Sequence, residues 1–290
     1  MDLSNGRVVR DIMGIYGISA QKKYGQNFLT DTGVLDSIVE GSGVSGDDTV
    51  LEIGPGLGAL TQRLAAVAGR VVAVEIDSAL IPVLGRTLEG CDNVDIIHAD
   101  ILNCDIRELN RQYGENRGLK VTANLPYYIT TPIVLKLLEY SDIIDTITVM
   151  VQKEVAIRMQ AGPGSKDYGA LSLAVRYYSE PRVITEVPAD CFYPSPAVDS
   201  AVIRLDLRRE PVVDVPDEDL LFKLVRATFN MRRKTLPNAL SAGVPGLTRE
   251  RVGEMLDAMG KPQTVRGETF TLDEFAELTR RVYDSGDNKM

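Results

Sequence analysis

Short apolar runs rich in β-branched residues alternate with amphipathic stretches along the first half of the chain. The apolar runs are residues 49–53, 70–76, 94–98, 120–123 and 146–151. Runs of this length are typical of parallel strands buried on both faces. The stretches between them, residues 59–68, 80–89, 106–113 and 132–140, have helical spacing, and Pro132 stands in a first turn, where proline is tolerated. The alternation predicts a doubly wound α/β sheet.

The pattern changes after residue 151. Helical spacing is expected at residues 154–159 and 171–178, and residues 182–187 and 201–207 are expected to form two antiparallel edge strands. Charged residues, proline and valine dominate residues 208–219, which is typical of a linker. Further amphipathic helices are expected beyond it. We therefore predict an α/β domain at residues 1–210 and a smaller helical domain at residues 211–290.

The first 48 residues carry a basic loop and a buried anchor. Helical fragments come first, then Lys22 and Lys23, then Phe28 and Leu29, and a short helix is expected at residues 34–39. We expect the side chains of Phe28 and Leu29 to pack on the core and hold this segment in place.

Composition excludes several classes of protein. The 290 residues are 44% hydrophobic and 25% charged, which is typical of a soluble globular protein. No apolar run approaches the roughly 20 residues that span a bilayer, so we expect a cytoplasmic protein without a membrane partner. Three cysteines and one histidine argue against a disulfide framework and against a metal site.

Charge is unevenly distributed. The formal net charge of −9 disfavours a polyanionic partner, but nucleic-acid binding depends on local patches. Residues 222–240 contain five basic residues and no acidic one, with Arg232, Arg233 and Lys234 consecutive. These three side chains, with Lys22 and Lys23, are candidates for phosphate contacts, although such runs are more often solvated faces.

A glycine-rich turn follows the first predicted strand. Residues 52–58 have the spacing G-x-G-x-G, with Pro55 inside the turn. Gly54 and Gly56 lack a Cβ, so a ligand can approach the backbone there, as nucleotide-type cofactors do. The spacing differs from the G-x-G-x-x-G of nicotinamide enzymes, and a tight turn without a ligand is the alternative.

Acidic residues end the next two strands. Glu75 lies about 20 residues after the glycine turn, where a carboxylate accepts hydrogen bonds from ribose hydroxyls. Asp100 ends the third strand, where it can accept from an adenine amino group or cap the following helix.

The fourth predicted strand ends at Asn124, followed by Leu125, Pro126 and Tyr127. An Asn side-chain oxygen, a backbone carbonyl fixed by the following proline and an aromatic face can together hold a flat base that carries an amino group. A turn with packed tyrosines is the alternative. Because three strand ends point to one crevice, we favour a site.

The chain resembles the ribosomal RNA adenine N6-dimethyltransferase family, and within it the bacterial members that act on the small subunit. The blocks that carry the resemblance are residues 26–29, 52–58, 74–77, 99–100, 124–131, 151–159, 192–202 and 232–236. The resemblance implies a seven-stranded Rossmann-like methyltransferase domain at residues 1–210 that uses S-adenosylmethionine, and an RNA-binding helical domain at residues 211–290.

The resemblance also implies the role of individual residues. It assigns S-adenosylmethionine contacts to residues of the N-terminal segment, the glycine turn and the later strand ends, namely Asn27, Leu29, Gly54, Gly56, Glu75, Asp100 and Asn124. Asn124, Leu125, Pro126 and Tyr127 would hold the target adenine, with Tyr127 stacked on the base. Phe192 resembles the aromatic residue that closes the other face of the base, and packing in a proline-rich crossover is its alternative.

The implied activity is dimethylation of N6 on two adjacent adenines in a 3′-terminal hairpin loop of small-subunit ribosomal RNA, on an assembling 30S subunit. We expect a monomer. The alternatives are a large-subunit RNA methyltransferase of the macrolide-resistance type, a ribosome-assembly factor that binds RNA on the same fold, and a nicotinamide oxidoreductase. The last does not explain residues 124–127.

Overall fold

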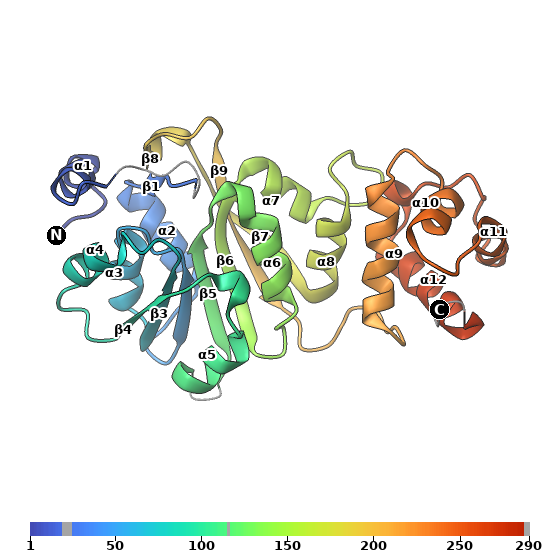
Figure 1. The fold of residues 1–290 in the computed structure, drawn as a ribbon, viewed down its shortest axis with the longest axis horizontal. Coiled ribbons are helices and arrows are strands. Elements are labelled where there is room, and N and C mark those ends of the chain that lie inside the picture. Colours follow the sequence, from blue (N-terminus) through green and yellow to red (C-terminus); the bar gives the residue numbers. More distant parts are fainter. Residues whose placement is uncertain (19–24, 115–116, 287–290) are drawn as a thin grey trace. The chain divides into compact units, whose positions relative to one another are not determined.

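A seven-stranded sheet organises the first compact unit, residues 1–156 and 179–209 (Figure 1). The structure, a computed structural model, describes residues 1–18, 25–114 and 117–286. The sheet order is β4-β3-β2-β5-β6-β9-β7. Its strands are β2 (Thr49–Ile53), β3 (Arg70–Glu75), β4 (Val94–His98), β5 (Leu119–Asn124), β6 (Ile144–Gln152), β7 (Ser179–Val187) and β9 (Ser200–Leu207). The predicted doubly wound α/β fold is confirmed.

Strand pairing determines where the crevice of the sheet lies. β2 pairs in parallel with both β3 and β5, so the chain leaves β2 in one direction and later returns to its other side. At such a reversal the connections diverge and leave a crevice at the carboxyl ends of the strands. β9 pairs antiparallel with β6 and β7, which confirms the predicted antiparallel edge. β4 is only half-buried, because it is the opposite edge strand.

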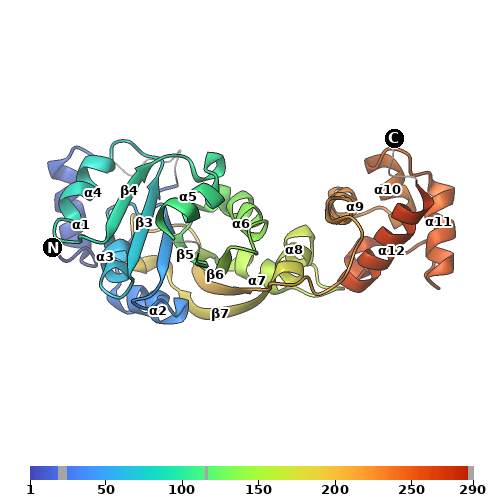
Figure 2. The same cartoon turned by 90° about the horizontal axis from the view of Figure 1, so that it is seen from below.

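Helices cover both faces of this sheet. Figure 2 shows α2, α3 and α4 on one face and α5 and α6 on the other. Their bounds, with the N-terminal helix first, are α1 (Gly6–Ile15), α2 (Thr32–Ser42), α3 (Ala59–Ala65), α4 (Ile81–Thr87), α5 (Ile106–Tyr113) and α6 (Thr130–Leu138). Within the described residues, no helix has the length and apolar character needed to cross a membrane.

A second, two-stranded sheet was not predicted. β1 (Phe28–Leu29) pairs antiparallel with β8 (Phe192–Tyr193), so that Leu29 lies opposite Phe192. Both strands are only two residues long, and their partners are more than 160 positions apart, so no local pattern could reveal the pairing. The pairing fixes the N-terminal segment against the loop before β9.

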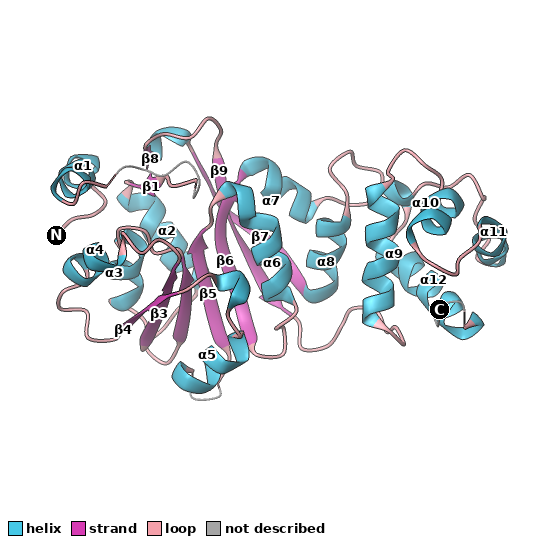
Figure 3. Cartoon of the chain, in the orientation of Figure 1, coloured by secondary structure: helices cyan, strands magenta, loops and turns pink. Residues whose placement is uncertain are grey.

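The second compact unit is helical (Figure 3). Its helices are α8 (Ala170–Tyr178), α9 (Glu218–Asn230), α10 (Leu236–Gly243), α11 (Arg249–Ala258) and α12 (Leu272–Ser285), and the chain first enters the unit within α7 (Lys153–Gln160). They share one apolar core, in which the buried Leu173 of α8 packs with residues of α9 and α12. Residues 157–178 therefore belong to this unit by packing, whereas the division predicted from the sequence placed them before residue 210.

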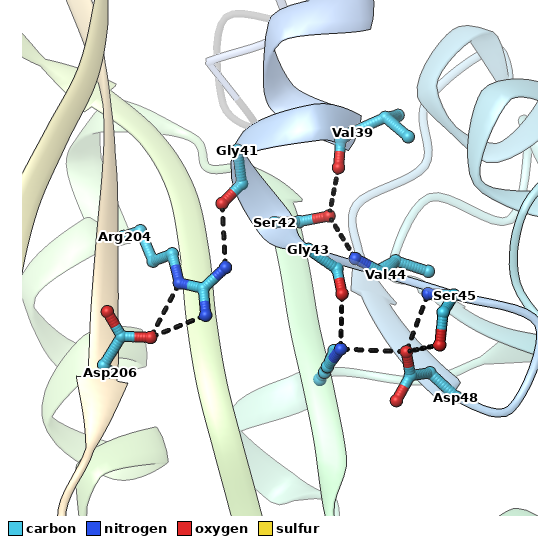
Figure 4. Close-up of polar contacts among 10 residues, drawn as sticks. Val39, Gly41, Ser42, Gly43, Val44, Ser45, Asp48, Arg204 and Asp206 are labelled. Carbon is cyan, nitrogen blue, oxygen red and sulfur yellow. Dashed lines mark hydrogen bonds and ion pairs between the residues drawn. The ribbon is translucent and has the colours of Figure 1, made fainter.

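Helix α2 is held at both ends, and Figure 4 shows the contacts at its C-terminal end. Asp31 caps its start by accepting from Val34 N at 2.9 Å, directly after β1. At its other end, Arg204 donates to Gly41 O at 3.0 Å and Lys120 donates to Gly43 O at 2.5 Å. Cations at a helix C-terminus satisfy its last carbonyls and oppose the helix dipole. The helix thus fixes the segment that precedes it, residues 27–29, relative to the sheet.

Asp48 connects the hydrogen bonds at the C-terminal end of α2 to the sheet. Its Oδ2 accepts from Lys120 Nζ at 2.8 Å and from Ser45 N and Oγ at 2.7 Å each. Burial raises the pKa of Asp48, but the hydrogen bonds from Lys120 and Ser45 together outweigh it and hold this pKa below its ordinary value. The stability that the carboxylate contributes is therefore present above the unfolded-state pKa and lost as the pH falls through the folded-state pKa.

We predict that Asp48→Asn lowers the free energy of unfolding by about 2 kcal/mol at neutral pH, since a charge-assisted bond is lost and Lys120 keeps no carboxylate partner. The deficit should shrink as the pH falls into the acidic range. Urea unfolding across pH tests this, with Asp47→Asn at the neighbouring exposed position as the control. A deficit that does not change with pH would contradict the account.

Candidate active site

A cavity lies at the carboxyl ends of β2, β3 and β5. Four segments line it: residues 25–29, the glycine turn, the end of β3, and residues 124–128. Leu3 and Val9, from the N-terminal region, close one side. The cavity therefore occupies the crevice that the strand order predicts.

The glycine turn has the backbone that only glycine adopts readily. Gly54 and Gly56 have φ values of 68° and 61°, in the left-handed region. A Cβ built on Gly54 meets nothing within 4 Å, and one on Gly56 would lie 3.3 Å from the ring of Phe28. The turn thus offers bare backbone to a ligand, and a side chain at Gly54 would occupy the ligand's space.

Glu75 is anchored by backbone N–H groups. Its Oε2 accepts from Gly56 N at 3.2 Å and its Oε1 from Asp77 N at 2.8 Å. Burial raises the pKa of Glu75 above its ordinary value, although these bonds act in the opposite direction. Each carboxylate oxygen has a further lone pair, so the predicted bonds to ribose hydroxyls remain available to it.

Asn124 is oriented by the N-terminal segment. Its Nδ2 donates to the carbonyl oxygen of Asn27 at 3.2 Å, and Asn27 Nδ2 donates to Gly25 O at 3.3 Å. Because the amide nitrogen of Asn124 is engaged in this way, Oδ1 is the atom left to accept a hydrogen bond at the cavity. This is the orientation that recognition of an amino group requires.

Leu125 and Pro126 are fixed by the backbone. Leu125 N donates to Met150 O at 3.1 Å, and the Leu125 side chain is buried. Pro126 O accepts from Ile129 N at 3.2 Å and from Thr130 Oγ1 at 3.1 Å. Within the described part of the chain, no hydrogen bond reaches the carbonyl oxygen of Leu125. The cavity thus has two fixed acceptors on consecutive residues.

Tyr127 lines the cavity beside these acceptors and is half-buried. It begins a single helical turn, η3 (Tyr127–Ile129). Its hydroxyl shares a hydrogen bond with the hydroxyl of Ser200 at 2.7 Å. Burial raises the pKa of Tyr127, so the phenol is neutral at physiological pH.

Two of the residues predicted to contact the cofactor or the base do not line the cavity. Asp100 accepts from Leu102 N at 2.9 Å and caps η2 (Ile101–Asn103), which is the alternative role that the sequence allowed. Phe192 is 4% exposed and packs in an apolar cluster with Leu29 and Leu35. Its packing matches the alternative for this residue, and the ligand contacts predicted for both residues stay predictions.

Of the five basic residues predicted to contact RNA, the structure describes three. Arg232, Arg233 and Lys234 are exposed between α9 and α10 of the second unit. Arg232 donates to the backbone oxygen of Lys166 at 2.8 Å and lies 5.9 Å from the ring centroid of Phe229. Lys22 and Lys23 lie outside the described residues. Among the described residues, no group of three or more His, Cys, Asp or Glu side chains could hold a metal ion.

Glu52 is a cavity residue that was not singled out in the sequence. It is 1% exposed, and its Oε2 has no hydrogen-bond partner among the described residues. Burial raises the pKa of Glu52 to about 8, and the nearby charge of Glu75 acts in the same direction. An acidic residue inside an otherwise apolar strand was the available signal, because such a residue is rarely buried without a function.

We predict that Glu52 makes the wild-type protein less stable as the pH rises. Its contribution to stability is fully present below the unfolded-state pKa and is lost as the pH rises to about 8. The loss is on the order of 4 kcal/mol. Glu52→Gln should remove this pH dependence, so the stability of the variant relative to wild type should increase between acidic and weakly alkaline pH. Parallel unfolding profiles across that range would contradict the prediction.

Comparison with known proteins places the chain in a family. The sequence profile described as "Ribosomal RNA adenine dimethylase" matches residues 17–269. The chain is 53% identical to "Ribosomal RNA small subunit methyltransferase A" of Lachnoclostridium phytofermentans, over 92% of this chain and 93% of that protein. It is 48% identical to the protein of the same name from Geobacillus thermodenitrificans, over 97% of each chain.

Solved structures agree with this placement. A dimethyladenosine transferase from Plasmodium falciparum is 25% identical with a TM-score of 0.73, over 89% of this chain and 98% of that one. The 23S rRNA methyltransferase ErmE is 28% identical with a TM-score of 0.65, over 89% of this chain and 100% of that one. The profile covers most of the chain and the curated relatives match it nearly end to end, so this chain belongs to the ribosomal RNA adenine dimethylase family.

Proposed function

We propose that this protein transfers methyl groups from S-adenosylmethionine to N6 of two adjacent adenines in a 3′-terminal hairpin loop of small-subunit ribosomal RNA, during assembly of the 30S subunit. The observation that carries the proposal is the pair of fixed acceptors at the cavity, Asn124 Oδ1 and Leu125 O, beside the ring of Tyr127.

The residues around the cavity fit the cofactor. Gly54 and Gly56 leave bare backbone for a nucleotide-type ligand, and the Glu75 carboxylate is fixed beside them by Gly56 N. A buried, fixed carboxylate suits a ribose, because each of its oxygens can accept a hydroxyl hydrogen bond. When bound, S-adenosylmethionine supplies a methyl group that is already activated by the positive charge on sulfur.

The chain's own residues then act on the adenine amino group. The N6 lone pair is delocalised into the ring, so the amino group is a poor nucleophile. If Asn124 Oδ1 and Leu125 O each accept one N6 hydrogen, they favour a more tetrahedral nitrogen whose lone pair is directed out of the ring plane. Orientation of this kind can contribute roughly 7 kcal/mol or more to a lower barrier.

Tyr127 supplies the surface on which the base rests. A base must leave its stack to reach the cavity, and stacking on an aromatic ring offsets part of that cost. Because the phenol of Tyr127 is neutral, it is not a general base. We propose that the N6 proton leaves to water after methyl transfer, so no catalytic histidine is required.

The second methylation requires the site to tolerate the loss of one hydrogen bond. A monomethylated N6 retains a single hydrogen, so only one of the two acceptors, Asn124 Oδ1 or Leu125 O, can be satisfied. The acceptors lie on consecutive residues of a fixed backbone, so one can hold the remaining hydrogen while the methyl group occupies the space beside the other.

The identity of the RNA rests on the relatives. The curated relatives at 48–53% identity are named for the small subunit, whereas the large-subunit enzyme ErmE is 28% identical. We therefore favour small-subunit RNA over the macrolide-resistance type of substrate. We further propose that Arg232, Arg233 and Lys234, with Lys22 and Lys23, contact RNA phosphates, and that the protein acts in the cytoplasm as a monomer.

Substrate choice is tested by methyl transfer in vitro. The protein is incubated with radiolabelled S-adenosylmethionine and either unmethylated small subunits or naked large-subunit RNA, and the labelled bases are mapped. We expect label on two adjacent adenines of the small-subunit RNA. Label on the large-subunit RNA alone would overturn this substrate, and subunit binding without label would favour an assembly factor.

The role of Asn124 is tested by Asn124→Ala. We predict that transfer falls by roughly 100-fold or more, the usual effect of removing one preorganised polar group at a reacting centre. S-adenosylmethionine binding, measured by calorimetry, should remain detectable because Glu75 and the glycine turn are intact. Asn238→Ala, on α10, serves as the control and should transfer normally. Near-normal turnover of Asn124→Ala would contradict the role.

A further inference from the structure

The hydroxyl of Tyr127 is bonded to a buried serine far away in the sequence. Tyr127 and Ser200 are 73 positions apart, and their hydroxyl oxygens lie 2.7 Å from each other. Ser200 is 0% exposed and is the first residue of β9. A buried hydroxyl that bonds a residue lining the cavity needs an explanation beyond packing.

The backbone of Ser200 is fixed on both sides. β9 lies between β6 and β7, and Ser200 stands opposite Gln152 on one neighbour and Val187 on the other. A residue held by strands on both sides has little freedom to shift along the sheet. Its hydroxyl is therefore a rigid point of attachment.

Strand β6 pairs both with the strand that leads to residues 124–125 and with the strand that begins at Ser200. Asn124 stands opposite Met150, and Leu125 N donates to Met150 O at 3.1 Å. Two residues further along the same strand, Gln152 stands opposite Ser200. Met150 therefore positions the acceptors at residues 124–125, and Gln152 pairs with Ser200, which bonds the hydroxyl of Tyr127. The two contact points lie two residues apart on β6.

We propose that Ser200 is a positioning residue for methyl transfer, holding the ring of Tyr127 in the plane on which the target adenine stacks beside Asn124 Oδ1 and Leu125 O. The proposal rests on the proposed function of the same site. A tyrosine side chain has two rotatable bonds, and a hydrogen bond at its far end restricts both. The ring is then ordered before the base arrives, which lowers the entropic cost of stacking.

The effect should not depend on proton transfer. Burial raises the pKa of Tyr127, so the phenol keeps its proton in the neutral pH range. Loss of the bond should therefore lower kcat/KM for the RNA by the same factor at every pH in that range, while the affinity for S-adenosylmethionine stays the same.

The test compares Ser200→Ala, Tyr127→Phe and the double variant on unmethylated small subunits. Each single change removes the same hydrogen bond, so each should lower kcat/KM roughly fivefold, and the double variant should be no worse than either single variant. Multiplied losses in the double variant, or normal kcat/KM in Ser200→Ala, would overturn the proposal.

A matched control separates positioning from general damage to the sheet. Thr148 on β6 is also 0% exposed, and its hydroxyl oxygen has no partner among the described residues. Thr148→Val removes a buried hydroxyl from the same pair of strands without touching Tyr127. It should leave kcat/KM unchanged, and a loss equal to that of Ser200→Ala would indicate a structural effect alone.

A second readout does not depend on activity. Three-bond scalar couplings of Tyr127 report its χ1 angle in the folded protein. We expect one rotamer in the wild type and averaging over rotamers in Ser200→Ala. An unchanged single rotamer in that variant would overturn the positioning role. If the wild type labels no RNA, the proposed function fails, and the couplings still decide whether Ser200 orders the ring.

Discussion

The hydrogen bond from Asn124 Nδ2 to the carbonyl oxygen of Asn27 is the interaction on which the site depends. It fixes the amide so that Oδ1 is the end available at the cavity, and it joins the N-terminal segment to the end of β5. That segment is itself held by the pairing of β1 with β8 and by the cap of α2. One polar contact thus couples the segment expected to contact the cofactor to the group expected to hold the base.

The site also carries a cost in stability. Glu52 and Glu75 are both buried beside the glycine turn, and burial raises the pKa of each. Only Glu75 is compensated by backbone N–H groups at both oxygens. A fold selected for stability alone would place apolar residues there, because uncompensated buried carboxyl groups oppose folding. Their presence beside the cavity is consistent with a binding role.

Local patterns predicted the strands, the glycine turn, and the strand-end positions of Glu75 and Asn124, because apolar runs and glycine spacing report directly on the backbone. Contacts between distant residues were not predictable. The β1–β8 pairing, the Tyr127–Ser200 bond and the packing of α8 with the second unit each join segments with no shared sequence signal. The cap at Asp100 is local, because it bonds Leu102 N two residues further on, and the sequence offered it as an alternative. The burial of Phe192 depends instead on Leu29 and Leu35, which are distant in the sequence.

The central claim is that two fixed acceptors hold the adenine amino group. A crystal structure of the protein with S-adenosylhomocysteine and an RNA that presents the target adenine would test it most directly. The account predicts that N6 lies about 3 Å from both Asn124 Oδ1 and Leu125 O, with the base stacked on Tyr127. An adenine whose N6 points away from both oxygens would contradict it.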